Sequence, residues 1–392
     1  MSTDSVRHQK ISEALKAHKI DGLICQLPEN VVFLTGFWPL TGTSWVVFSA
    51  DGQHKLIIPA CEAIEAEQYG EKDFSVYEWA HLKADNPLEQ IEGCLRLICQ
   101  YFQIHNGIIG IEENFANVAP PLNMGESCVP CKSSKELISH ALPKARLLDA
   151  TDIINNLRTI KTDHEIRKLR IANEIAAFGL AAFRENAREG ISEIELACRV
   201  NSAVAINGSG YKNTISARGF AQISSAGSTE RGWRPCEITS NRRLEKGDIV
   251  ILELGVVSDG FWADNTRVVV LGGANTQQKE VYNILLTAQS MAIEKIKPGV
   301  KMTDIDKAAR DVVEKAGYGE YFIHITGHGI GWRYHEFPPL LAPGNETVLE
   351  EGMVTSVEPG VYIPGFGGMR IEDIVAVGKD GANTLSTFCR EL

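Results

Sequence analysis

The chain contains 392 residues, of which 44% are hydrophobic and 23% are charged. This composition is that of a globular protein, and the length is sufficient for two domains. The 50 acidic residues outnumber the 39 basic ones and give a formal net charge of −11. Such an acidic excess disfavours a nucleic-acid partner and an anionic membrane surface. We therefore expect neither.

The N-terminus and the cysteines indicate the cellular compartment. The first ten residues are polar and lack the apolar core of a signal peptide. No apolar run approaches the roughly 18 residues that a membrane span needs. The nine cysteines are scattered, as is usual for reduced thiols. Cys128 and Cys131 form one Cys-x-x-Cys without a second ligand pair nearby, so we interpret them as free thiols. These features predict a cytoplasmic protein.

The first part of the chain alternates helix-like and strand-like segments. The predicted helices cover residues 5–19 and about 86–104, and the predicted strands cover residues 21–26, 45–49, 54–59 and 107–112. A turn at residues 50–53 joins the second and third of these strands, whereas residues 31–37 show no clear period. The pattern predicts an α/β domain over residues 1–155.

Residues 156–392 predict a second domain with long helices. The first helix runs from about Asp163 to Ala187, and the next opens at Ser192. Because Glu195 follows Ser192 by three residues, the two residues can form a capping box.

The second domain also shows a weak internal repeat. The first set of recurring positions is Gly190-Ile191, Ile194, Ala197 and Gly208, and the second is Gly299-Val300, Ile305, Ala308 and Gly317. In each copy a long helix precedes a shorter one, and a turn with glycine then leads to strands. We therefore expect an α+β domain built from duplicated helix-helix-hairpin halves, with a site between the copies.

The first predicted hairpin carries two acids within apolar strands. Glu253 and Asp264 lie at nearly equal distances from the turn at Ser258-Asp259-Gly260. Residues opposite each other in an antiparallel pair have Cβ atoms about 4.5–5.5 Å apart. Two carboxylates at that distance repel unless a cation lies between them. The pair therefore predicts a cation site.

A second hairpin repeats this arrangement. Glu358 and Glu372 are equidistant from Gly365, which lies in a Pro364-Gly365 turn. One opposed pair of acids in a hairpin could arise by chance. Two such pairs, one in each half of an apparently duplicated domain, favour a common site.

Three histidines follow the second helix pair. His324, His328 and His335 lie within twelve residues of a chain that has only ten histidines. Four carboxylates and one imidazole can hold two divalent cations of the manganese, cobalt, zinc or iron type. Two such cations about 3.5–4 Å apart would activate a bridging water and polarise a carbonyl group. The other histidines would contact substrate or transfer protons.

Other features of these segments have simpler interpretations. The glycines at 327, 329 and 331 would let the backbone pass close to a bound group. We interpret Asp259 as a turn former and Asp373 as a solvated acid. A single acid beside a strand is usually a solvated surface residue, so the prediction rests on the whole set of ligands.

With these motifs the chain resembles the pita-bread metallopeptidases, which include methionine aminopeptidase, aminopeptidase P and prolidase. The resemblance covers essentially the whole chain. Residues 1–155 look like the creatinase-type N-terminal domain, with Asn30-Val-Val-Phe-Leu-Thr-Gly-Phe as the clearest signature. Leu157-Arg-Thr-Ile-Lys-Thr-Asp-His-Glu-Ile opens the catalytic domain as in the two-domain members. The N-terminal domain argues against methionine aminopeptidase.

The resemblance also implies roles for particular residues. The implied metal ligands are Glu253, Asp264, His328, Glu358 and Glu372. Glu358 matches the position usually described as the general base. His324 and His335 match histidines that position the substrate and its tetrahedral intermediate. Arg370 matches an arginine that helps to fix the substrate in proline-specific members.

Two positions depart from the family pattern. The family normally has aspartate where this chain has Glu253, and the longer side chain either crowds the site or displaces one of the two metals. Proline-specific members also carry a histidine upstream of the first hairpin, but residues 225–237 contain none. Trp233 and Arg234 lie in that stretch. The expected number of divalent metals is therefore two, or one if Glu253 fills a position.

The resemblance predicts a metal-dependent hydrolase of the peptide bond before proline, acting on a dipeptide or short peptide. Two alternatives stay open. One is a non-peptidase enzyme of the same fold, such as an amidinohydrolase, an ectoine hydrolase or a lyase. The other is a non-catalytic module that binds peptides. The missing upstream histidine counts against the amidinohydrolase. By resemblance we also expect a homodimer.

Overall fold

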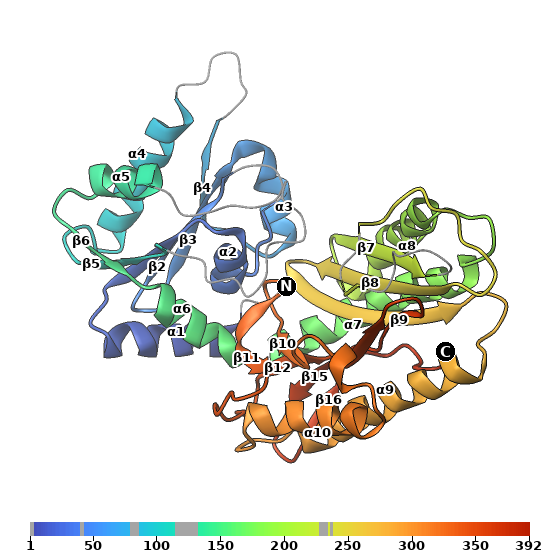
Figure 1. Ribbon diagram of the computed structural model, residues 1–392. Coiled ribbons are helices and arrows are strands. Elements are labelled where there is room, and N and C mark those ends of the chain that lie inside the picture. The colour runs from blue at the N-terminus through green and yellow to red at the C-terminus, as the bar shows by residue number, and fades with distance from the viewer. Residues whose placement is uncertain (1–3, 40–42, 79–85, 114–131, 227–233, 236–237) are drawn as a thin grey trace. The chain divides into compact units, whose positions relative to one another are not determined.

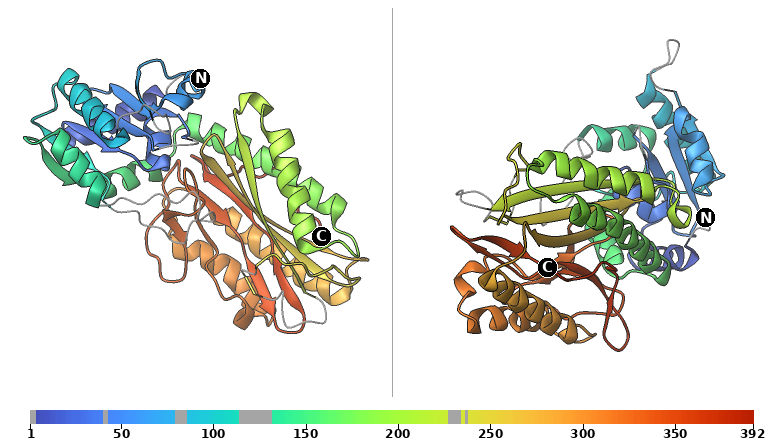
Figure 2. Two further views of the ribbon diagram at one scale, coloured as in Figure 1. Left: turned by 90° about the horizontal axis from the view of Figure 1, so that it is seen from above. Right: turned by 90° about the vertical axis from the view of Figure 1, so that its right-hand side faces the viewer.

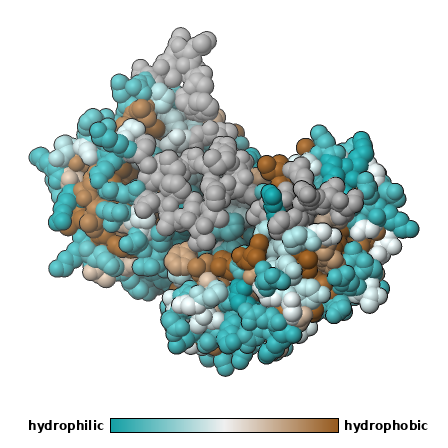
Figure 3. All heavy atoms as spheres, in the orientation of Figure 1, coloured by the Kyte–Doolittle hydropathy of each residue, from teal (hydrophilic) through white to brown (hydrophobic). Residues whose placement is uncertain are grey.

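The computed structural model describes residues 4–39, 43–78, 86–113, 132–226, 234–235 and 238–392 (Figure 1). The chain forms two compact units, Met1–Arg158 and Thr159–Leu392. Cys128, Cys131 and Trp233 lie outside the described residues. None of the helices within these ranges is long and apolar enough to cross a membrane. On the face in Figure 3, hydrophilic residues predominate where helices α9 (Thr276–Lys295) and α10 (Met302–Lys315) lie.

The first unit is built on a mixed six-stranded sheet with the strand order β4-β3-β2-β1-β5-β6. Its strands are β1 (Gly22–Cys25), β2 (Trp45–Ser49), β3 (His54–Pro59), β4 (Phe74–Tyr77), β5 (Ile108–Ile111) and β6 (Arg146–Asp149). Its helices are α1 (Ser5–Ala17), α2 (Pro28–Thr35), α3 (Ala63–Gln68), α4 (Pro87–Tyr101), α5 (Lys132–Ala141) and α6 (Thr151–Thr159). Apolar side chains of α4 and α5 form one core with those of the sheet.

Helix α2 occupies the stretch in which the sequence shows no period. All its residues from Asn30 to Thr35 are buried. A helix buried on every side has no polar face, so its sequence carries no amphipathic signal. Pro28 lies in its first turn, and Gly36 ends it with φ 82°.

The second unit contains two helix pairs, each followed by antiparallel strands. The helices are α7 (Asp163–Asn186), α8 (Glu193–Gly208), α9 (Thr276–Lys295) and α10 (Met302–Lys315). The strands of the first half are β7 (Ala217–Ala226), β8 (Ile249–Ser258) and β9 (Phe261–Val270). Those of the second half are β10 (Gly327–Gly329), β11 (Glu336–Leu341), β12 (Val354–Val357), β13 (Gly360–Ile363), β14 (Gly367–Arg370), β15 (Asp373–Val377) and β16 (Ala382–Thr384).

Each helix pair packs on the strands of its own half. One apolar core joins α7 and α8 to β7, β8 and β9, and a second joins α9 and α10 mainly to the strands that follow them. Figure 2 shows the two helix pairs on opposite outer sides of the strands. The sequence prediction of duplicated helix-helix-hairpin halves is confirmed. The predicted capping box at the start of α8 also forms, between Ser192 and Glu195.

Candidate metal centre

The first predicted pair of acids lies on the β8–β9 hairpin, in a register that differs from the prediction. Glu253 faces Thr266, and Asp264 faces Gly255. The loop consists of Asp259 and Gly260, both with positive φ, so its centre lies between them. The predicted direct opposition was therefore wrong by two residues along β9. Glu253 and Asp264 are instead diagonal neighbours on one face of the ladder.

The second predicted pair lies at a junction between two ladders. Strands β13 and β14 pair from Ile363↔Gly367 to Gly360↔Arg370, and the pairing of β12 with β15 resumes at Val357↔Asp373. Glu358 and Glu372 lie between these ladders at matching positions. Their predicted equidistance from the turn at Gly365 is confirmed. Both side chains thus reach the same place from the second half.

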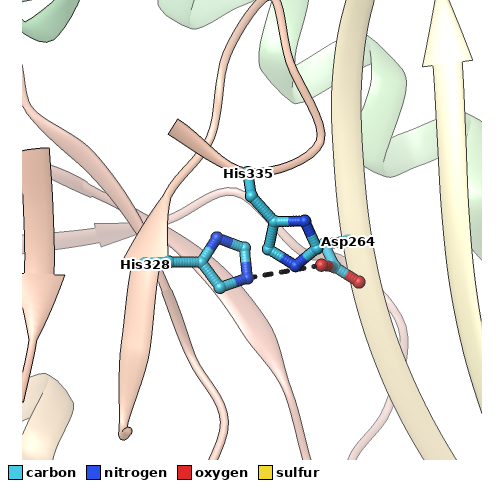
Figure 4. Close-up of side chains that lie close together, drawn as sticks. All are labelled: Asp264, His328 and His335. Atoms are coloured by element: carbon cyan, nitrogen blue, oxygen red, sulfur yellow. Dashed lines mark ion pairs between the residues drawn. The ribbon is translucent and has the colours of Figure 1, made fainter. Parts of the chain in front are cut away.

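His328 lies on β10 and faces these carboxylates. Its Nδ1 lies 2.9 Å from the backbone oxygen of Gly329, and a proton donated there leaves Nε2 free to act as a ligand. Nε2 lies 3.3 Å from Glu358 Oε1 and 3.6 Å from Asp264 Oδ2. Figure 4 shows the side chains of Asp264, His328 and His335 pointing toward one another. The imidazole therefore links carboxylates of both halves.

The glycines around His328 are required by packing. A Cβ atom on Gly327 would lie 2.0 Å from the backbone oxygen of Ser356. One on Gly329 would lie 2.9 Å from the backbone oxygen of Glu336. One on Gly331 would lie 2.8 Å from a carboxylate oxygen of the same glutamate. Close packing against neighbouring protein atoms is therefore one reason for glycine at these three positions, and the approach of the backbone to a bound group stays a prediction.

Ligand atoms of six side chains converge closely enough to hold metal ions. They form three overlapping groups, in each of which the ligand atoms lie within 4.8 Å of one another. The groups are Glu253, Asp264 and Glu372; His328, Glu358 and Glu372; and Asp264, His328 and His335. The structure thus brings together all five predicted metal ligands. It adds His335, which the sequence placed only near the substrate.

Burial of two carboxyl groups makes this cluster electrostatically unfavourable without a cation. Burial raises the pKa of Asp264 to about 7. Burial, and then the neighbouring Asp264, raise the pKa of Glu372 to about 8. Among the described residues no hydrogen-bond donor reaches Asp264 Oδ2 or Glu372 Oε1. Buried carboxylate oxygens without donors beside an imidazole fit a divalent cation.

The two other predicted histidines precede and follow His328 in the chain. His335 packs its ring against that of His328, with centroids 4.2 Å apart. His324 contacts the backbone oxygen of Ile325 through Nδ1, at 2.7 Å, and the hydroxyl of Tyr362 through Nε2, at 3.0 Å. Burial lowers the pKa of His324 to about 4, and burial lowers the pKa of His335 to about 3. Both rings are therefore neutral near pH 7.

Arg370 is buried and faces the carboxylates. It forms an ion pair with Glu253. Its Nε donates to Thr266 Oγ1 at 2.9 Å, and Nη1 donates to the hydroxyl of Tyr362 at 2.8 Å. Arg234, in the stretch that lacks the upstream histidine, is exposed. The arginine at the carboxylates is thus Arg370.

Sequence analysis missed several hydroxyl groups of this site, including those of Thr266 and Tyr334. Thr266 contacts carboxylates of both halves, and Tyr334 contacts Glu253 and Asp264. Thr266 follows Asp264 by two residues on a strand, so the two-residue period of a strand could have indicated it. Tyr334 lies outside the strands, where no such period exists.

Asp373 also differs from its prediction. Its side chain is buried and forms ion pairs with Arg267 and Arg390. It is therefore a structural acid beside the site, and its interpretation as a solvated acid was wrong. Asp259, by contrast, forms the β8–β9 turn as expected.

Comparisons with known proteins identify the family. Residues 167–379 match the family described as metallopeptidase family M24, and residues 7–160 match the creatinase/prolidase N-terminal domain. The chain belongs to metallopeptidase family M24. Its second unit therefore has the pita-bread fold, and its first unit is the creatinase-type domain.

Individual relatives match nearly the whole chain. The Xaa-Pro dipeptidase of Pyrococcus horikoshii is 33% identical, over 98% of this chain and 97% of its own. The solved structure of prolidase from Pyrococcus furiosus is 31% identical, covers 97% of this chain and 100% of its own, and gives a TM-score of 0.73. An X-Pro aminopeptidase structure from Thermotoga maritima is 26% identical, covers 98% of both chains, and gives a TM-score of 0.78.

Membership of a metallopeptidase family implies divalent metal ions. The donor set of this M24 chain fits them, because it combines hard carboxylate oxygens with the imidazoles of His328 and His335. The donors also come from both halves of the second unit, which matches the predicted site between the two copies.

Proposed function

We propose that this chain is a metal-dependent peptidase that hydrolyses the peptide bond before proline in dipeptides or short peptides. The observation that carries the proposal is the convergence of four carboxylates and two imidazoles in a largely buried cluster. Full-length similarity to Xaa-Pro dipeptidases supports the substrate class. The relatives and solved structures reported above support this activity and not the non-peptidase or the binding-module alternative.

The proposed metal ligands are Glu253, Asp264, His328, Glu358 and Glu372. Divalent ions of the manganese, cobalt, zinc or iron type suit these donors, with manganese first to be tested. When bound, such ions lower the pKa of a water molecule and polarise the scissile carbonyl group. The protein's own part is to fix the ligands.

Glu358 is suited to take the proton from the attacking water. Its side chain is 13% exposed, so a substrate can reach it. The hydroxyl of Ser356 donates to Glu358 Oε1 at 2.9 Å and fixes the carboxylate. Glu372, by comparison, is fully buried. This difference supports proton transfer by Glu358 and ligation alone by Glu372.

His324, His335 and Arg370 are the proposed substrate-binding groups. The lowered pKa of each histidine keeps its ring neutral. A neutral His335 can offer one donor and one acceptor to a peptide group, whereas both ring nitrogens of His324 already contact Ile325 and Tyr362. Tyr362 connects His324 to Arg370, since its hydroxyl lies beside both side chains. A single hydroxyl thus orients two substrate-binding side chains.

Peptide hydrolysis with a matched panel tests the proposal. Ala-Pro and Leu-Pro represent dipeptides, Ala-Pro-Ala represents a longer substrate, and Ala-Ala lacks proline. We expect Mn²⁺-dependent cleavage of the proline peptides, and little cleavage of Ala-Ala. Cleavage of the tripeptide would assign aminopeptidase activity, and its absence would assign dipeptidase activity. The variant His328→Ala is the inactive control. No turnover of any proline peptide with Mn²⁺ or Co²⁺ present would overturn the proposal.

A homodimer remains part of the proposal by resemblance to the two-domain members. Light scattering at micromolar concentration tests it. A mass of twice the chain is expected, and a monomer would contradict it.

A further inference from the structure

Arg267 lies on β9 behind the metal-ligand cluster. It directly follows Thr266, and successive residues of a strand point to opposite faces, so its side chain points away from the face that carries the carboxylates. The residue is 3% exposed. An arginine side chain has five N–H donors, and a buried one needs acceptors for them. The partners of this guanidinium group therefore define what Arg267 does.

The guanidinium group donates to three separate parts of the chain. Nη1 donates to the backbone oxygens of Thr266 and Glu372, at 2.8 and 2.6 Å. Nη2 donates to Asp373 Oδ1 at 2.7 Å and to the backbone oxygen of Phe388 at 3.0 Å. Nε donates to the backbone oxygen of Cys389 at 2.9 Å. One side chain thus joins β9, the start of β15 and the end of the chain.

The backbone of Glu372 is held on both sides by these contacts. Its N–H donates to the backbone oxygen of Thr266 at 3.3 Å, and its own oxygen accepts from Arg267. The side chain of Glu372 belongs to two of the three groups of converging ligand atoms. Arg267 therefore reaches a metal ligand through the backbone of that ligand.

Residues 386–392, which we call the C-terminal segment, supply two of the acceptors of Arg267. The segment is also attached through Arg390. Arg390 Nε forms an ion pair with Asp373 at 2.6 Å, and the backbone oxygen of Arg390 accepts from the hydroxyl of Tyr282 at 2.9 Å. The segment thus binds the same buried acid that Arg267 binds.

This arrangement makes docking of the C-terminal segment and metal binding depend on each other. Without a cation, the buried carboxylates of Asp264 and Glu372 repel each other. Arg267 joins the two strands that carry them and so opposes their separation. A coupling between two sites acts equally in both directions, so a bound metal must also hold the segment more firmly.

We propose that Arg267 is a positioning residue, and that the C-terminal segment acts through it to keep Glu372 in place for metal binding. The end of the chain is thereby coupled to the metal centre. This inference rests on the metal centre of the proposed function and is independent of the peptide substrate.

Release of the C-terminal segment tests the coupling in the wild-type protein. A serine carboxypeptidase, which needs no metal, digests the full-length protein with chelator or with Mn²⁺, and mass spectrometry follows the loss of each residue. Removal of Arg390 and of the residues before it should be about tenfold or more slower with Mn²⁺. A free peptide with the sequence of residues 386–392 controls for any direct effect of Mn²⁺ on the carboxypeptidase.

Arg267→Lys tests the coupling in the other direction. Lysine keeps the positive charge beside Asp373 but lacks the planar fork and two of the five donors. We expect Mn²⁺ affinity, measured by calorimetric titration, to fall by about 10- to 100-fold. The slowing of digestion by Mn²⁺ should shrink in parallel. Thermal unfolding of the chelated variant measures its stability separately.

Arg242→Lys is the matched control. Arg242 lies in the same unit and binds Asp248 through two nitrogens and Ser225 through one, and neither partner is a proposed metal ligand. This variant should bind Mn²⁺ as the wild type does. If Arg267→Lys fails to fold, the digestion of the wild-type protein still decides.

The contrary outcomes are distinct. Equal digestion of the wild-type segment with chelator and with Mn²⁺ would overturn the inference. So would a less stable Arg267→Lys protein with unchanged Mn²⁺ affinity, because Arg267 would then be structural only. Binding of no Mn²⁺ by the wild type would overturn both this inference and the metal centre of the proposed function. Coupling without hydrolysis of any proline peptide would support this inference and remove only the proposed substrate.

Discussion

Thr266 lies directly opposite Glu253 in the β8–β9 ladder and connects it to Glu372 of the second hairpin. Its Oγ1 lies 2.9 Å from Glu253 Oε2 and 2.8 Å from Glu372 Oε2. The same oxygen accepts a hydrogen bond from Arg370 Nε at 2.9 Å. One buried hydroxyl therefore holds carboxylates from both halves of the domain. Groups that orient metal ligands in this way tune metal affinity.

Replacing Thr266 by valine removes that hydroxyl while nearly preserving the shape of the side chain. We expect Thr266→Val to weaken Mn²⁺ binding by about 10- to 100-fold, because Glu253 and Glu372 lose a common orienting partner. The protein without metal should lose about 1–3 kcal/mol of stability, since Arg370 Nε loses its acceptor. Calorimetric titration and thermal unfolding measure the two effects.

Thr266→Ser is the matched control, because it keeps the hydroxyl and removes only a methyl group. It should retain most of the Mn²⁺ affinity. Equal losses in the serine and valine variants would show that packing of the methyl group, and not the hydrogen bonds, holds the carboxylates.

Asp264→Asn separates metal binding from folding. Burial raises the pKa of Asp264 to about 7, so its charged form is disfavoured in the folded protein. The amide removes this charge at nearly constant volume. We expect the chelated protein to unfold at an equal or higher temperature than wild type near pH 8, whereas the stabilisation by Mn²⁺ and the peptidase activity fall at least tenfold.

Thermal scans with and without Mn²⁺ check this prediction. A large loss of stability in the chelated Asp264→Asn protein would contradict it. Such a loss would mean that the carboxylate is required for folding itself.

The site was predicted from sequence where a residue's position follows from chain geometry. Glu358 and Glu372 flank a short turn, so their matching positions could be read from the spacing. His328 was indicated by its place among closely spaced histidines and glycines. Long segments such as α7 and α8 were likewise predicted, because periodicity and capping boxes are local signals.

What the sequence could not predict depends on exact register or on the environment. The residue that faces Glu253 across the β8–β9 ladder is Thr266, and this pairing depends on a loop of only two residues. A small error in the assumed centre of that loop changes which residue of β9 is paired with Glu253. Helix α2 has no polar face, so its period is hidden. Tyr334 lies in an irregular stretch, and only the tertiary fold brings its hydroxyl to the carboxylates.

The stability of the chelated protein should fall as the pH rises from about 6.5 to 8.5. Asp264 and Glu372 have folded pKa values of about 7 and about 8, above those of unfolded carboxyl groups. The folded state therefore binds more protons, and its advantage disappears as pH rises through these values. Bound Mn²⁺ should reduce this loss of stability at high pH, because it favours the charged carboxylates.

The titration of His324 and His335 sets the lower end of this pH range. The folded pKa of His324 is about 4 and that of His335 about 3, below the unfolded value near 6.5. Their contribution to stability therefore rises with pH and is complete above about pH 6.5. Unfolding temperatures measured with chelator and with Mn²⁺ across the window provide the test. A chelated protein that becomes more stable toward pH 8.5 would contradict the prediction.

A buried ion pair supports the stretch that carries Tyr334 and His335. Lys161 Nζ lies 2.9 Å from Glu336 Oε2, and the side chains are 0% and 6% exposed. The other carboxylate oxygen accepts backbone N–H groups of Trp332 and Arg333, at 3.0 and 3.2 Å. Glu336 thus connects a buried charge to the backbone directly before Tyr334.

Glu336→Gln should destabilise the second unit by about 3–5 kcal/mol, because it leaves a buried ammonium group beside a neutral amide. The double variant Lys161→Met, Glu336→Gln removes both charges and should recover much of this loss. The glutamine oxygen can still accept the two backbone N–H groups, so Mn²⁺ affinity in the double variant should stay close to wild type. Thermal unfolding and Mn²⁺ titration of both variants test this, and a loss below about 1 kcal/mol in the single variant would contradict it.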